Sequence, residues 1–299
     1  MNQYVRAVSQ PNVFGKSSKE GSITHIQKLG DPVEKILTQK MIEDYQNDGV
    51  VFIPGMFKQS VEKLRSGIEQ NMKEPGPYAT ENLHAHELGR FFDDYCNWNR
   101  IQTFYEVIQQ PFIAEIAAHL MKSQRVQLFH EHVLVKEPGT SKPTPWHSDA
   151  PYYFTDGQQN VSFWVPLDPV KENSLRVVAG SHKWQKPVLP TRWLSEQNFY
   201  PDSDLYQPVP DPDAEGMSII EYNMQPGDAV AFHFNALHGA RGNHSAERRR
   251  AFSLRLLGDD ARYIERPGPT SPPFPGHAMQ PGERLRKDWF PILLDQSSL

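Results

Sequence analysis

The chain has 299 residues and a mass of 34.3 kDa, which is enough for one large hydrophobic core. Its formal net charge of −5 at pH 7 provides no basic footprint for nucleic acid or for an anionic membrane surface, so we expect neither partner. Cys96 is the single cysteine, which excludes an intramolecular disulfide, and the N-terminus has no apolar signal core; both features are typical of a soluble cytoplasmic protein.

The N-terminal third of the chain has the pattern of a helical region. Residues 1–30 are polar and weakly patterned, which predicts an N-terminal arm. Apolar side chains at helical spacing predict a first helix over residues 32–47, which Asp48-Gly49 ends, and a short strand over 50–54. Ser60 is placed to cap a second helix, and two further helical segments are expected over residues 100–121, broken near Pro111.

From about residue 126 the pattern changes to short apolar runs with period-two alternation and frequent Pro and Gly. The expected strands cover residues 126–136, 146–149, 161–167, 174–178, 218–222, 229–234 and 251–257. A mainly β chain with a helical N-terminal third suits a double-stranded β-helix, the cupin-like jelly-roll, with the helices covering the larger sheet. We therefore expect a single domain over 31–299: helical part about 31–125, jelly-roll core about 126–260 and a Pro-rich tail about 261–299.

One long connection stands out within the β-rich part. Residues 184–216 are rich in Pro and acidic residues and show no clear element. A connection of that length is uncommon in a compact domain and often forms a lid or a wall of a substrate site.

The segment Thr144-Pro-Trp-His-Ser-Asp149 and the distant His238 carry ligand types for a transition metal. Alternate residues of a strand point the same way, so His147 and Asp149 are expected to emerge together, with His238 arriving from another strand. Two imidazoles and one carboxylate leave coordination positions open, as in non-haem Fe(II) oxygenases. The sequence thus predicts an iron site formed by His147, Asp149 and His238.

A strand eleven residues beyond His238 supplies a candidate anion contact. In residues 248–256 Phe252, Leu254 and Leu256 share one face, while Arg249, Ala251, Ser253 and Arg255 share the other. A guanidinium on the metal-facing side is suited to a bidentate grip on a carboxylate. Arg249 therefore indicates a dicarboxylate cosubstrate, with 2-oxoglutarate the obvious candidate, and Ser253 is a candidate second contact to it.

Over most of its length the sequence resembles the phytanoyl-CoA dioxygenase family of Fe(II)/2-oxoglutarate oxygenases. The matching segments are Leu134-Val-Lys-Glu-Pro-Gly139, Trp146-His-Ser-Asp149, Trp164-Val-Pro-Leu-Asp168, Ala179-Gly-Ser-His182, Pro226-Gly-Asp228 and His238-Gly-Ala240. The resemblance implies that His147, Asp149 and His238 hold iron, that Arg249 binds the far carboxylate of 2-oxoglutarate, and that Trp164 lines its pocket. It further implies that Fe(II), 2-oxoglutarate and O2 hydroxylate an aliphatic C–H bond of a small-molecule metabolite, with release of succinate and CO2.

One position departs from the family pattern. Some members have a Ser two residues after the distal His as a second cosubstrate contact, whereas this chain has Ala240. That contact is therefore either absent or supplied by another residue.

Candidate substrate residues surround these motifs. His130 and His132 alternate with Lys136 on one expected strand, and we weigh a substrate role against a structural one for the two histidines; Tyr152 and Tyr153 follow the metal motif and are candidates for an aromatic wall. Arg255 is a candidate for binding an acidic group of the substrate, or else for pairing with Asp259 or Asp260. His182 and His233 are expected to be structural.

Alternative functions remain in view. Halogenation needs an open position where Asp149 stands, and a zinc hydrolase has no need of Arg249. A non-catalytic cupin-like binding protein and an acyl-CoA hydroxylase of the same family stay open, although no lysine-rich surface suggests a site for the phosphates of CoA. The substrate, the oligomeric state, and the choice among hydroxylation, desaturation and cyclisation are not determined by the sequence.

Overall fold

The computed structural model describes residues 33–84, 86–171, 173–195, 197–200 and 203–296. The expected N-terminal arm over 1–30 lies outside these residues. The helices are α1 (Gln39–Asp48), α2 (Val61–Lys73), α3 (Gln102–Ile108) and α4 (Pro111–Met121), with 3₁₀ turns η1 (Lys58–Ser60), η2 (Ala150–Tyr152) and η3 (Ser181–Lys183). None of the helices described is long and apolar enough to cross a membrane.

Two antiparallel sheets form the β part of the molecule. The larger sheet has the order β1 (Val50–Ile53), β10 (Ala229–Phe232), β7 (Asn160–Pro166), β12 (Arg249–Leu257), β4 (Arg125–Lys136), β3 (Phe91–Tyr95), β2 (Thr80–Glu81), with β14 (Ile292–Asp295) also paired to β4. The smaller sheet has the order β5 (Thr144–His147), β11 (His238–Ala240), β8 (Leu175–Val178), β9 (Ile219–Glu221). A separate pair joins β6 (Thr155–Asp156) to β13 (Arg262–Tyr263).

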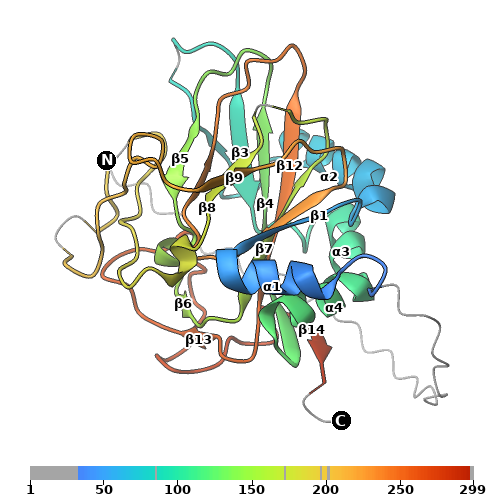
Figure 1. Cartoon of the computed structure of the whole chain (residues 1–299), viewed down its shortest axis with the longest axis vertical. Coiled ribbons are helices and arrows are strands. Elements are labelled where there is room, and N and C mark those ends of the chain that lie inside the picture. Colours follow the sequence, from blue (N-terminus) through green and yellow to red (C-terminus); the bar gives the residue numbers. More distant parts are fainter. Residues whose placement is uncertain (1–32, 85, 172, 196, 201–202, 297–299) are drawn as a thin grey trace.

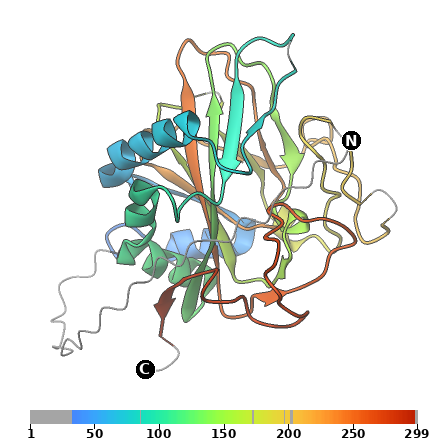
Figure 2. The ribbon, with the colours of Figure 1, turned by 180° about the vertical axis from the view of Figure 1, so that it is seen from behind.

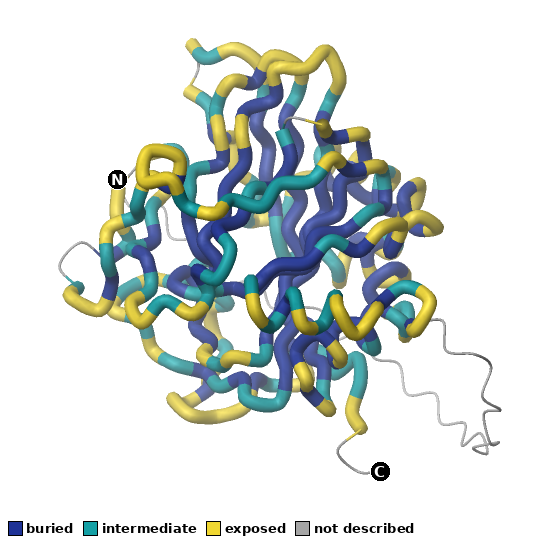
Figure 3. Tube along the Cα trace, in the orientation of Figure 1, coloured by how far each residue is buried: buried dark blue, intermediate teal, exposed yellow. Residues whose placement is uncertain are grey.

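The larger sheet has a different partner on each face (Figures 1 and 2). Phe252, Leu254 and Leu256 of β12 are buried in one core cluster with side chains of all four helices. Ala251 of β12 packs instead with Leu175 and Val177 of β8 in a second cluster between the sheets. The mainly β, jelly-roll prediction with helices over the larger sheet is therefore confirmed, and Figure 3 shows the central strands buried and the outer loops exposed.

The first helix begins later than predicted, and the second follows Ser60 without the predicted capping hydrogen bond. The Thr38 hydroxyl accepts a hydrogen bond from Met41 N, so α1 begins at Gln39 rather than near residue 32; it ends at Gly49, which has φ +73°. The expected cap at Ser60 is wrong, because its side chain makes no capping hydrogen bond and instead accepts one from the Gln110 amide.

A buried carboxyl lies on β4, on the opposite side of the strand from the metal. Glu131 is fully buried; Oε1 accepts a hydrogen bond from Asn97 N, and Oε2 has no partner among the described residues. Burial raises the pKa of Glu131 from 4.5 to about 8. The folded state therefore keeps a proton that the unfolded chain releases above pH 4.5, and the stability that this proton contributes is lost as the pH rises toward 8.

We expect Glu131→Gln to remove this pH dependence, because the amide cannot ionise and still accepts from Asn97. Near pH 5 the variant and the parent protein should have similar free energies of unfolding. Above pH 8 the variant should be more stable by on the order of a few kcal/mol. Urea unfolding between pH 5 and 9 measures the difference, and a difference that stays constant across this range would contradict the assignment.

Candidate metal centre and adjoining cavities

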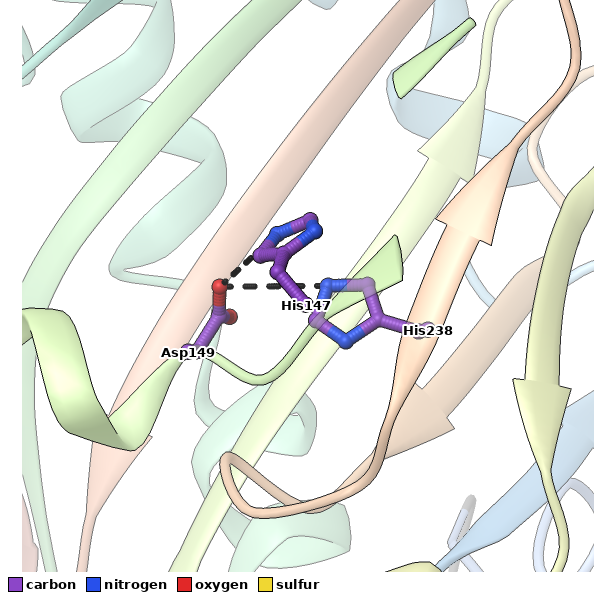
Figure 4. Close-up of side chains that lie close together, drawn as sticks. All are labelled: His147, Asp149 and His238. Carbon is purple, nitrogen blue, oxygen red and sulfur yellow. Dashed lines mark ion pairs between the residues drawn. The ribbon is translucent and has the colours of Figure 1, made fainter. Parts of the chain in front are cut away.

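Three buried side chains converge between the two sheets (Figure 4). His147 ends β5 and His238 begins β11, where the two residues are direct cross-strand partners. Asp149 Oδ1 lies 3.7 Å from His147 Nε2 and 3.8 Å from His238 Nε2. One ligand atom from each of the three residues lies within 4.8 Å of the others, a spacing that fits a single metal ion.

Asp149 reaches His147 in a different way from the strand alternation that the sequence predicted. The expected strand over 146–149 ends at His147, and Asp149 has helical backbone angles at the start of η2. A turn, and not strand alternation, therefore brings the carboxylate to the imidazoles.

Backbone carbonyls fix the tautomer of both imidazoles. His147 Nδ1 lies 2.8 Å from Pro145 O, and His238 Nδ1 lies 2.9 Å from Ala236 O. A carbonyl only accepts, so each Nδ1–H donates and each Nε2 keeps a lone pair toward the centre. Burial lowers the pKa of His238 to about 3, so this ring is neutral at physiological pH.

The second oxygen of Asp149 is held away from the imidazoles. Oδ2 lies 3.2 Å from Ser162 Oγ and 3.3 Å from Arg255 Nε. Burial on its own raises the pKa of Asp149, but Arg255 and the two histidines outweigh it and hold the pKa well below its usual value. The result is an ionised carboxylate that presents Oδ1 to the centre.

Arg255 therefore has a partner that the sequence did not indicate. The expected pairing with Asp259 or Asp260 is wrong, since Asp259 accepts from Ser123 and Gln124 and Asp260 accepts from Gln158 and Gln159. Arg255 also donates from Nε to the Tyr153 hydroxyl.

A small cavity adjoins His238 on the side of β12. It is lined by Leu134, Thr144, Trp164, Leu175, Ala240, Arg249 and Ser253, among others. Arg249 is buried and donates to the Asn173 carbonyl, but none of the described carboxylates pairs with it. Burial lowers the pKa of Arg249 to about 10, which leaves it cationic at neutral pH. Ser253 Oγ is buried here without a hydrogen-bond partner.

This cavity fits the carboxylate end of a small anion. A buried guanidinium whose charge no described carboxylate balances, and a buried hydroxyl with no hydrogen-bond partner among the described residues, are both costly unless a ligand completes them. Trp164 lines the same cavity, and so do Ala240 and its cross-strand partner Thr144.

A wider cavity of about 360 Å³ opens beside His147 and Asp149. It holds four of the five expected substrate residues: His132, Tyr152, Tyr153 and Arg255. The prediction for the fifth residue, Lys136, is wrong, because Lys136 does not line this cavity. Its Nζ donates to the carbonyls of Lys142 and Arg241 and lies 4.3 Å from the centre of the Phe91 ring.

Several residues of this wall were not predicted. Asp93 and Tyr95 come from β3, and Trp193, whose ring centre lies 5.1 Å from that of His147, comes from the long connection over 184–216. Part of the long connection therefore lines this cavity, and its role as a wall of a substrate site stays a prediction. The Phe91-Phe-Asp-Asp-Tyr95 segment of β3 does not alternate, so the sequence pattern did not indicate a strand here.

The two histidines expected to be structural lie outside the metal centre. His233 Nδ1 accepts from Asn235 N, its Nε2 lies 2.9 Å from Gln158 O, and His182 Nε2 lies 3.4 Å from Gln46 O. Among the residues that the structure describes, neither belongs to a group able to hold a metal.

Comparisons with known proteins agree with this fold. An Arabidopsis thaliana phytanoyl-CoA dioxygenase is 22% identical over 203 residues, which are 67% of this chain and 64% of that protein. The carbocyclase SnoK from nogalamycin biosynthesis has a TM-score of 0.67 and 23% identity, covering 86% of this chain and 96% of its own. The epimerase SnoN, in complex with Fe3+, alpha ketoglutarate and nogalamycin RO, has a TM-score of 0.68 and 22% identity, covering 85% and 98%.

The structural likenesses establish the fold, and the chain spans less than two thirds of the length of the Arabidopsis relative. The model of the family described as phytanoyl-CoA dioxygenase (PhyH) matches residues 45–251, which is more than half of the chain. This chain belongs to the phytanoyl-CoA dioxygenase family.

Proposed function

We propose that this protein is a non-haem Fe(II)/2-oxoglutarate-dependent dioxygenase that hydroxylates an aliphatic C–H bond of a small-molecule metabolite. The observation that carries the proposal is the pairing of two features: a buried His147–Asp149–His238 set, and a cationic Arg249 in the adjoining cavity that pairs with none of the described carboxylates. A zinc hydrolase needs the first feature but not the second.

Each residue has a role in this proposal. His147 Nε2, His238 Nε2 and Asp149 Oδ1 hold the iron, and Arg255 with Ser162 keeps Asp149 Oδ2 turned away from it. Arg249 and Ser253 bind the distant carboxylate of 2-oxoglutarate, Trp164 packs beside it, and Thr144 supplies the hydroxyl that Ala240 lacks. Bound iron, 2-oxoglutarate and O2 together supply the oxidising chemistry and release succinate and CO2.

The substrate binds in the wider cavity beside His147 and Asp149. Tyr152, Tyr153 and Trp193 form aromatic walls beside His147, and His132 and Arg255 offer polar contacts. These walls exclude bulk water from the metal and position the C–H bond next to it. The polar lining favours a compact metabolite over the acyl-CoA thioester that the family name suggests.

We further propose that the protein works in the cytoplasm on small molecules, without nucleic-acid partners. A lone cysteine suits a reducing compartment, and the net charge of −5 offers no attraction to a polyanion.

The proposal predicts a visible chromophore and slow uncoupled turnover. Mixing the protein with Fe(II) and 2-oxoglutarate without oxygen is expected to give the metal-to-ligand absorption band of an iron-bound keto acid. Admitting air should then release succinate in an iron-dependent manner. A His147→Ala control should show neither signal, and a parent protein that does no better than this control would contradict the proposal.

A further inference from the structure

Two imidazole rings on β4 line the substrate cavity without binding the metal. The ring Nδ1 of His130 lies 3.2 Å from Glu131 O, which can only accept a hydrogen bond, so Nδ1 carries the proton. Its Nε2 is therefore a lone-pair acceptor, and this buried atom has no hydrogen-bond partner in the part of the chain that the structure describes. Burial is the largest cause of a pKa of His130 well below its usual value, so the ring stays neutral.

The second ring, that of His132, is oriented by a carboxylate in the same wall. His132 Nε2 lies 2.8 Å from Asp93 Oδ2, and Asp93 Oδ1 accepts from the Asn82 amide at 2.8 Å. Because a carboxylate only accepts, Nε2 carries the proton in the single-proton tautomer that this contact selects. Nδ1 is then the second lone-pair acceptor, and no hydrogen bond to it is made by the described residues.

A buried hydrogen-bond donor stands across the strands from these acceptors. Arg255 is the cross-strand partner of His130, and its buried Nη1 has no hydrogen-bond partner among the described residues. The lining holds two carboxylates, Asp93 and Asp149, and two guanidiniums, Arg192 and Arg255, so its formal side-chain charges balance and favour neither an anion nor a cation. Aromatic rings of Tyr95, Trp193 and Phe199 complete the walls.

From these contacts we propose that the cavity binds a neutral, polyhydroxylated ring compound. One hydroxyl donates to His130 Nε2 and another to His132 Nδ1, while a substrate oxygen accepts from Arg255 Nη1 and the C–H faces of the ring pack on the aromatic side chains. The inference rests on the proposed function, which places the bound ring beside the iron. An acyl chain would satisfy none of the three polar atoms.

Direct binding of probe compounds tests this recognition. The full chain, loaded with Zn(II) as a diamagnetic substitute and with 2-oxoglutarate, is titrated with myo-inositol, methyl β-D-glucopyranoside, cyclohexanol and octanoyl-CoA, and saturation-transfer NMR reports the binding. We expect at least one of the two polyols to bind. Cyclohexanol and octanoyl-CoA should bind roughly tenfold more weakly than that polyol, because each lacks two or more of the hydrogen bonds that the polyol makes.

Two variants test the acceptor atoms themselves. Asp93→Asn lets the amide donate to His132 Nε2, which moves the ring proton to Nδ1 and turns that acceptor into a donor. His130→Phe keeps a ring and removes the lone pair. Each should weaken polyol binding by about tenfold, with the anaerobic Fe(II)–2-oxoglutarate band unchanged. The control His244→Phe changes an exposed histidine outside the cavity and should bind the polyol normally.

Tighter binding of cyclohexanol or octanoyl-CoA than of either polyol would overturn the inference, and so would unchanged polyol binding in both variants. If both variants lose the absorption band as well as polyol binding, Asp93 and His130 have a structural role instead. A parent protein that forms the band but binds no polyol refutes this inference alone. A parent protein that binds a polyol but forms no band refutes the proposed function alone.

Discussion

Alanine in place of His147, Asp149 or His238 is expected to abolish Fe(II) binding at micromolar metal while the chain remains folded. Each substitution removes one of three protein ligands, and losing even a supporting hydrogen bond around a ligand costs roughly 10- to 100-fold in metal affinity. The effect of losing a ligand itself should be larger. Metal content after dialysis and the anaerobic absorption band measure the loss, and circular dichroism checks the fold.

The matched control is another buried histidine close in sequence to the third ligand. His233 is 4% exposed, its ring is bonded to Gln158 and Asn235, and it lies outside the metal group. The His233→Ala variant should therefore still bind Fe(II), even where the substitution lowers the free energy of unfolding. Metal loss in His233→Ala equal to that in His238→Ala would show that the ligand set is misassigned.

The β12 strand shows why part of this site could be predicted from sequence. Both faces of the larger sheet are buried, one under helices and one against the smaller sheet, so the period of two in 249–257 is preserved without interruption. Phe252 faces the helices, and Arg249 and Ser253 reach the small cavity, as the alternation predicts. Strand alternation is reliable where burial of both faces fixes the register.

Elsewhere apolar spacing and local charge were misleading. Val33 and Leu37 lie at helical spacing because they pack into the core, although they precede the Thr38 cap and lie outside α1. β3 went unrecognised because Asp93 and Asp94 look like surface residues; both are buried, held by the amides of Asn82 and Asn71. Buried carboxylates satisfied by distant amides leave no local signal.

The partner of Arg255 illustrates the same limit. Two carboxylates lie within five positions of it in sequence, yet its partner is Asp149, delivered by the turn after β5. Register across β12 and β7 places Arg255 opposite Ser162, and both side chains meet the same Asp149 oxygen. Such a contact depends on sheet topology, which no short window of sequence contains.

Arg249→Ala is expected to weaken 2-oxoglutarate binding by roughly thirty- to several-hundredfold, with Fe(II) still bound. Loss of a charge-assisted contact to a carboxylate costs on the order of 2–4 kcal/mol, which corresponds to that range. Arg249→Lys should lie between the parent protein and the alanine variant, because it keeps the charge but not the planar pair of donors. Titrating 2-oxoglutarate into the anaerobic Fe(II) protein and following the visible band gives the affinities.

The neighbouring arginines provide the controls for this prediction. Arg248 pairs with Glu69 and Glu137, and Arg250 pairs with Asp168 and Glu69, so neither guanidinium enters the small cavity. Arg248→Ala and Arg250→Ala should leave the affinity for 2-oxoglutarate within about twofold of the parent value, since neither side chain lines the small cavity and the charges of both are already balanced by carboxylates. Equal losses at all three positions would mean that the field of the whole basic run attracts the cosubstrate. A loss confined to Arg249 would instead assign recognition of the cosubstrate to this buried guanidinium, which pairs with no carboxylate among the described residues.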